Sequence, residues 1–150
     1  MPDFLTPDER SQRMARIRSK DTKPELALRR VLHRLGLRYR LGGSGLPGSP
    51  DLILPRYKVA IFVHGCFWHR HANCKVASTP KSNTEYWQKK FDTNVARDAN
   101  AIGRLDALGW RTYIVWECEL TSQPKAEATG KLLASVIRQD RSECISRNEA

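Results

Sequence analysis

The stretch that decides the fold is residues 51–64, which read Asp-Leu-Ile-Leu-Pro-Arg-Tyr-Lys-Val-Ala-Ile-Phe-Val-His. Two apolar runs, Asp51–Leu54 and Val59–Val63, flank a turn near Pro55 and predict two neighbouring strands. The second run is apolar without interruption, which is typical of a strand buried on both faces. We therefore expect a sheet with helices on both faces.

The rest of the chain supplies the other elements of an α/β fold. Thr6–Glu9 and Thr22–Glu25 both have the form of a capping box, with a proline at the first helical position in the former and at the second in the latter, so each predicts a helix start. A short strand near Arg38–Leu41 and the loop Gly42–Pro50 precede the central stretch. The expected downstream elements are a helix from Ser82 to Gly109, a strand over Trp110–Trp116 and a helix over Pro124–Arg138.

Charge and length indicate a single basic domain covering residues 1–150. The net charge is +10, and residues 1–40 contribute +6 of it through 11 basic and 5 acidic side chains. We expect residues 1–20 to form a basic helical arm and the polar residues 140–150 to form a disordered tail. Such an arm favours nucleic acid as the partner.

Composition also excludes several classes of protein. A hydrophobic share of 40% is too high for a disordered chain. No run approaches the roughly 18 apolar residues of a membrane span, and the first residues do not resemble a signal peptide. We expect a cytoplasmic monomer that does not bind membranes.

Candidate metal ligands are concentrated in residues 64–74, His-Gly-Cys-Phe-Trp-His-Arg-His-Ala-Asn-Cys. Cys66, His71 and Cys74, joined by the distant Cys118, match the four ligands of a structural zinc site. His69 could replace His71 on spacing alone, and buried free cysteines are the alternative interpretation. A zinc ion with four protein ligands cannot activate water, so any catalysis needs other groups. The fourth cysteine, Cys144, is predicted to be uninvolved.

Those other groups lie at the ends of the two central strands. A tight turn can bring Asp51 and His64 to the same end of the sheet, where a carboxylate could hold Mg²⁺ and His64 or His69 could serve as a base. Each residue alone also has an ordinary structural explanation. For Glu25 that explanation is the capping box, and for Asp98 it is the solvated face of a helix.

Two aromatic residues sit among the candidate zinc ligands. A rigid loop would present Phe67 and Trp68 as apolar wedges that could enter a DNA duplex, and Met14 on the basic arm could enter from another side. Packing under the loop, or in a helix core for Met14, is the alternative.

The sequence resembles the very-short-patch-repair (Vsr) DNA mismatch endonucleases over roughly residues 10–120. The matching segments are Met14 with its basic flanks, Asp21–Glu25, Leu46–Asp51, Ile61–His69, Asn94–Asp98, Leu108–Trp110 and Val115–Cys118. The resemblance implies a restriction-endonuclease-like fold, and hydrolysis of one DNA strand beside the thymine of a T:G mismatch left by deamination of 5-methylcytosine.

The resemblance also implies which residues carry the chemistry. Asp51 and the main-chain carbonyl of Val63 would hold Mg²⁺, and His64 and His69 would act on water or phosphate. Supporting residues would be Glu25, by orienting a histidine, and Asp98. The remaining assignments are structural zinc on Cys66, His71, Cys74 and Cys118, and intercalation by Met14, Phe67 and Trp68.

One departure and two alternatives accompany this hypothesis. The usual nuclease signature of this fold places a second acid and a lysine on the strand where Phe62, Val63 and His64 stand, so one direct carboxylate ligand remains for Mg²⁺. Mismatch-repair proteins are further candidate partners. The alternatives are a restriction-like nuclease of different specificity and a zinc-containing DNA-binding module without catalysis.

Overall fold

The computed structural model describes residues 22–41, 45–75 and 77–149, without the side chains of residues 140–149. The predicted first helix, the basic arm of residues 1–20 and Met14 lie outside this range. Among the described helices, none combines the length and apolarity that crossing a membrane requires.

The described elements form a mixed four-stranded sheet with the strand order β1-β2-β3-β4. The strands β1 and β2, and β2 and β3, are antiparallel, whereas β3 and β4 are parallel. Among the described residues, the elements follow the predicted order. Their bounds are α2 Lys23–Arg34, β1 Arg40–Leu41, β2 Leu52–Leu54, β3 Val59–His64, α3 Thr84–Ala107, β4 Arg111–Trp116, a short 3₁₀ helix η1 Glu117–Leu120, and α4 Gln123–Glu149.

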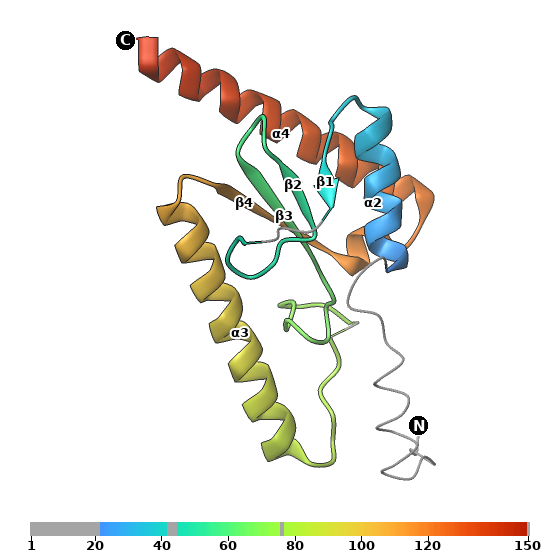
Figure 1. Cartoon of the computed structure of the whole chain (residues 1–150). Coiled ribbons are helices and arrows are strands. Elements are labelled where there is room, and N and C mark those ends of the chain that lie inside the picture. The colour runs from blue at the N-terminus through green and yellow to red at the C-terminus, as the bar shows by residue number, and fades with distance from the viewer. Residues whose placement is uncertain (1–21, 42–44, 76, 150) are drawn as a thin grey trace.

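Helices cover both faces of the sheet, as expected. Figure 1 shows α2 and α4 on one side and α3 on the other. Alternate residues of β3 divide between the two layers: Val59 and Ile61 join the core under α2 and α4, while Ala60 and Phe62 join Leu105 of α3. Since side chains alternate along a strand, His64 falls on the α3 face.

A close approach of α4 to α2 depends on Gly130. A β-carbon at this position would overlap Cγ1 of Val31. Glycine therefore lets α4 lie against α2, and the two helices together cover the core side of β2 and β3.

The last helix differs from the prediction at its C-terminal end. The expected helix ended at Arg138 and a disordered tail followed, whereas α4 continues to Glu149. Residues 139–149 contain neither glycine nor proline, so the backbone has no residue that strongly opposes a continued helix.

Candidate active site and metal centre

A cavity of about 370 Å³ opens where β3 ends, between the sheet and α3. Three structural elements contribute its chemically active lining: the sheet, the loop after β3 and α3. These side chains and main-chain groups belong to Asp51, Val63, His64, His69, Arg97 and Asp98. The strand pairing explains part of this arrangement, because the residue before β2 and the last residues of β3 meet at one end of an antiparallel pair.

Asp51 is fixed by two hydrogen bonds to β3. Its amide donates to the carbonyl of Ile61 at 3.0 Å, and its Oδ2 accepts from the amide of Val63 at 2.7 Å. Burial raises the pKa of the Asp51 carboxyl from 3.8 to about 6, although the Val63 hydrogen bond opposes this shift. Burial thus disfavours the charged form of this carboxyl, and a bound cation would favour it.

Glu25 contributes to this electrostatic environment from α2. Its side chain is buried, its amide donates to Thr22 Oγ1 at 3.4 Å, and its carboxylate forms an ion pair with Arg29 one turn later. The negative charge of Glu25 further raises the pKa of Asp51, whereas Arg29 lowers it. Glu25 thus acts electrostatically on the cavity, and its expected function of orienting a histidine stays a prediction.

The two candidate histidines lie against each other in the cavity. The rings of His64 and His69 stack with centroids 3.8 Å apart and an angle of 8° between their planes. The pKa of His64 is lowered from 6.5 to about 4, first by burial and second by the neighbouring His69. His64 is therefore a neutral imidazole near pH 7, able to accept a proton.

Asp98 holds the second histidine. Its Oδ2 lies 2.6 Å from Nδ1 of His69. With Nδ1 turned to a carboxylate, Nε2 of His69 is the nitrogen left for a substrate or water. Asp98 is thus part of the site and does not lie on a solvated helix face.

Next to the cavity, three cysteines and a histidine form a second cluster. The side-chain ligand atoms of Cys66, His71, Cys74 and Cys118 all lie within 4.8 Å of one another. The loop after β3 supplies three of them and η1 supplies Cys118, whose Sγ is 3.5 Å from Nδ1 of His71. A set of three sulfur atoms and one imidazole nitrogen fits a tetrahedral zinc ion.

Without a bound cation, the thiols of Cys66 and Cys118 are neutral. Burial raises the pKa of Cys66 to about 12 and also raises that of Cys118. A divalent metal ion reverses this preference, because it binds the thiolate form. The loop is also tied to η1 by a hydrogen bond, since the amide of Cys66 donates to Oε1 of Glu117 at 2.9 Å.

Trp116 separates the two clusters. It pairs with His64 in the β3–β4 register, and its ring meets that of His64 edge-on at 5.4 Å. The ring of His71 stacks on Trp116 at 4.2 Å. Trp116 therefore contacts one histidine of the cavity and one histidine of the cysteine cluster.

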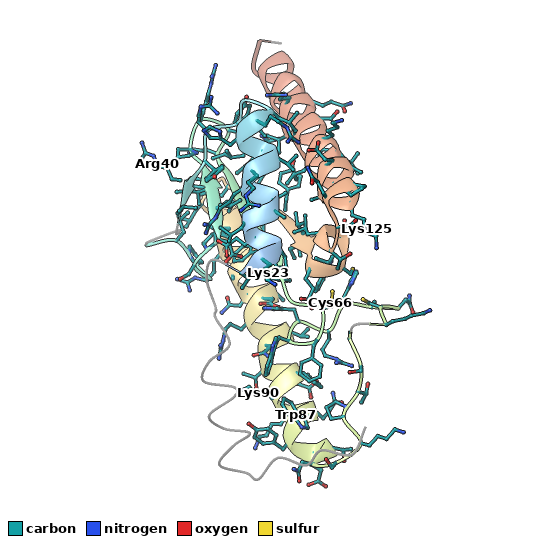
Figure 2. All side chains as sticks on the ribbon, turned by 90° about the vertical axis from the view of Figure 1, so that its right-hand side faces the viewer. Lys23, Arg40, Cys66, Trp87, Lys90 and Lys125 are labelled. Atoms are coloured by element: carbon teal, nitrogen blue, oxygen red, sulfur yellow. The ribbon has the colours of Figure 1, made fainter. Side chains whose placement is uncertain are left out.

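Phe67 and Trp68 belong to an aromatic cluster on the N-terminal half of α3. The ring of Phe67 lies 5.2 to 5.5 Å from those of Trp87 and Phe91, and Trp68 lies 5.9 Å from Trp87. Figure 2 shows Trp87 on the part of α3 that extends beyond the sheet, with Cys66 on the loop above it. Both rings of the loop are half-buried and thus keep one exposed side.

Sequence reasoning missed three residues of this region: Arg97, Trp87 and Trp116. Arg97 could have been found as the neighbour of Asp98. The sequence indicated Trp87 only as one of several apolar residues at helical spacing in the expected helix from Ser82 to Gly109. The position of Trp116 depends on the parallel pairing of β3 with β4, which spacing alone does not reveal.

Known proteins resemble this chain over most of its length. The family described as DNA mismatch endonuclease Vsr matches residues 2–75. A type II nicking enzyme of Xanthomonas oryzae, V.XorIIP, is 45% identical over 85% of this chain and 93% of its own. Another from Neisseria meningitidis, V.NmeAIP, is 42% identical over 82% and 87%. The DNA mismatch endonuclease Vsr of Escherichia coli is 42% identical over 83% and 80%.

These matches and the α/β sheet define the class of protein as a DNA endonuclease, a hydrolase that acts on DNA. The chain belongs to the Vsr family of DNA mismatch endonucleases.

Proposed function

We propose that this endonuclease nicks one DNA strand beside the thymine of a T:G mismatch, in a Mg²⁺-dependent reaction and on a restriction-endonuclease-like fold. The observation that carries the proposal is the cavity, which joins Asp51, His64 and the His69–Asp98 pair in one place. The names of the relatives support the proposal, since one is a mismatch endonuclease and others are nicking enzymes.

Asp51 and the main-chain carbonyl of Val63 would hold Mg²⁺. The fit rests on the chemistry of these donors, since Mg²⁺ prefers oxygen ligands and Asp51 and Val63 supply a carboxylate and a carbonyl oxygen at one end of the β2–β3 pair. When bound, the ion supplies charge for the phosphate oxygens of the cleaved bond. Asp51 itself contributes a carboxylate whose direction is fixed by the Val63 amide.

The histidines would handle protons. His64 is neutral and buried at the end of β3, so it can accept a proton from water. Asp98 would orient His69 so that its Nε2 faces the phosphate or the leaving oxygen and can donate a proton there. Arg97, also at the cavity, would contact a phosphate.

The cluster of Cys66, His71, Cys74 and Cys118 would bind a structural zinc ion. Its position explains why a loop without regular secondary structure can carry part of an active site: the ion would fix the loop to η1 after β4. His69 lies between two ligands in the sequence and would be held in place with them.

The exposed sides of Phe67 and Trp68 would wedge beside the mismatch, with Met14 from the arm as the opposing wedge. A specific observation favours a second candidate, a nuclease that ignores mismatches: both rings already pack against α3. In a nuclease that ignores mismatches, Phe67 and Trp68 would only pack the loop against α3.

Nicking assays on paired duplexes separate the two candidates. The substrates carry either T:G or C:G at one position in otherwise identical sequences. The proposed enzyme nicks the T:G duplex beside the thymine, and Trp68→Ala lowers that preference by about 10-fold or more while the protein stays folded. Equal cleavage of both duplexes by the unaltered protein contradicts mismatch specificity and supports the second candidate.

A further inference from the structure

We propose that His64, His69 and Asp98 form a second metal site in the cavity, one that takes a transition-metal ion such as Zn²⁺ and stops nicking when filled. The binding is a property of these three side chains alone. The inhibition rests on the proposed function, because it requires the same residues to act on water and phosphate.

The ligand atoms of the three side chains lie close enough together for one ion to bind them. Their ligand atoms all lie within 4.8 Å of one another, the same limit that the cysteine cluster meets. They come from three different elements, namely the end of β3, the following loop and α3. The rings of His64 and His69 stack in parallel, so their nitrogen lone pairs do not converge, and binding one ion through both rings requires one of them to turn.

An unsatisfied nitrogen provides a second, independent observation. His64 is only 5% exposed, and its Nδ1 is buried without a hydrogen-bond partner among the described residues. A buried polar atom without a partner is unfavourable and calls for an explanation. A metal ion bound through Nδ1 of His64 would give this nitrogen a partner.

The donor set decides which metal the site prefers. Two imidazole nitrogens and one carboxylate oxygen suit Zn²⁺, Co²⁺ or Ni²⁺, whereas Mg²⁺ prefers oxygen ligands. Three protein ligands also leave an open position, unlike the four ligands of the cysteine cluster. The cysteine cluster, with its thiolates, should fill first with zinc, and the cavity site should bind the next ion.

Occupation of this site would remove the proton acceptors of the proposed reaction. Each histidine nitrogen that binds an ion has no lone pair left for a proton. The bound ion would also replace the contact between His69 and Asp98 that orients the ring. Excess Mg²⁺ should relieve this inhibition poorly, because the two ions prefer different donors.

Calorimetric titration of zinc tests the binding without relying on activity. The protein is first loaded until its cysteine cluster is full and its zinc content is about one per chain, then titrated with Zn²⁺ in buffer containing Mg²⁺ and no DNA. We expect one further ion per chain. Asp98→Ala and His69→Ala should each weaken this second binding by at least about 10-fold while retaining the first zinc.

Asp92→Ala is the matched control, because Asp92 is an exposed carboxylate on the same helix. It should bind the second ion as the unaltered protein does. The proposal is overturned if the unaltered protein binds no second ion, or if Asp98→Ala and His69→Ala both bind it as tightly as the control. Retention of the first zinc and an unchanged circular dichroism spectrum show that each variant is folded.

Nicking assays then separate this proposal from the proposed function. Zinc concentrations that fill the second site should abolish most nicking even with Mg²⁺ in excess. If the second ion binds through these residues and nicking continues unchanged, the inhibitory part is wrong. A protein that binds the ion but never nicks DNA contradicts the proposed function and leaves the metal site standing.

Discussion

At the scale of single residues, the contact between Asp98 and His69 is the most specific feature of the cavity. The carboxylate and the ring nitrogen are 2.6 Å apart and join a helix to a loop that lies 29 positions away in the sequence. Removing the negative charge while keeping the shape of the side chain therefore tests whether the pair serves the chemistry.

Asp98→Asn should lower the rate of nicking by about 10- to 100-fold, because a neutral amide holds Nδ1 of His69 more weakly than a carboxylate does and orients the ring less firmly. Affinity for DNA should change little. Single-turnover rates and gel-shift titrations measure the two quantities. Asp92→Asn on the exposed side of α3 is the control, and an Asp98→Asn enzyme with the rate of this control would contradict the assignment.

Asp51 gives a prediction about pH. Its carboxyl ionises near 3.8 in the unfolded chain and near 6 in the folded one, so between these values the folded chain holds more protons and stability falls as pH rises. His64 has the opposite effect, because its pKa is lowered on folding. Comparing Asp51→Asn with the unaltered protein isolates the first effect.

We expect the melting temperature of Asp51→Asn, relative to the unaltered protein, to rise by about 2–4 °C between pH 4 and pH 6 in Mg²⁺-free buffer. This corresponds to about 1 kcal/mol, allowing for solvent screening of a partly exposed carboxyl. Thermal melts at closely spaced pH values measure it. A difference between the two proteins that does not change with pH would show that Asp51 ionises normally.

At the scale of elements, α3 has oppositely charged sides. Lys90, Arg97 and Arg104 recur at heptad spacing along one side, and Arg97 borders the cavity. Glu85, Asp92 and Asp106 follow another side at intervals of one and two heptads. Figure 2 shows Lys90 on the half of the helix that extends beyond the sheet. The basic side therefore offers a path for the DNA backbone that leads to the cavity.

Neutralising this side should weaken DNA binding and its dependence on salt. Each of Lys90→Gln and Arg104→Gln should lower affinity several-fold and reduce the slope of log K against log salt by about 1. Binding titrations at several salt concentrations measure both. Lys131→Gln removes the same charge from α4 on the other face of the sheet and should leave the slope unchanged; equal effects of all three would show that only net charge matters.

The elements themselves were largely predictable from the sequence. The apolar run of β3 and the capping box of Thr22 specified a buried strand and a helix start that the structure contains. Predictions were less accurate where the local signal was weak. The end of α4 had no stop signal, and α3 begins at Thr84 after an N-cap residue, Asn83, whose side chain makes no capping hydrogen bond. The partners of Asp98 and Trp116 depend on long-range packing, which residue spacing does not encode.

At the scale of the whole molecule, the cluster of three cysteines and one histidine brings together side chains from segments that are far apart in the sequence. The loop after β3 carries three candidate ligands and part of the cavity, and Cys118 belongs to η1. Metal binding should therefore stabilise the fold as well as position the loop.

Cys118→Ser should lower the melting temperature by at least about 6 °C, the shift that about 3 kcal/mol produces in a domain of this size. Metal analysis should give about one zinc per unaltered chain and clearly less for the variant. Cys144→Ser is the control, and it should keep both the zinc and the melting temperature. A zinc-free protein of unchanged stability would contradict the structural metal site.

The most direct test of the central claim is strand-resolved cleavage of a T:G duplex by the unaltered protein and by Asp51→Ala, each with and without Mg²⁺. We expect one nick beside the mismatched thymine for the unaltered protein with Mg²⁺, and a rate at least about 100-fold lower for Asp51→Ala or without Mg²⁺. Cleavage by Asp51→Ala at the rate of the unaltered protein would contradict the claim that this cavity is the active site.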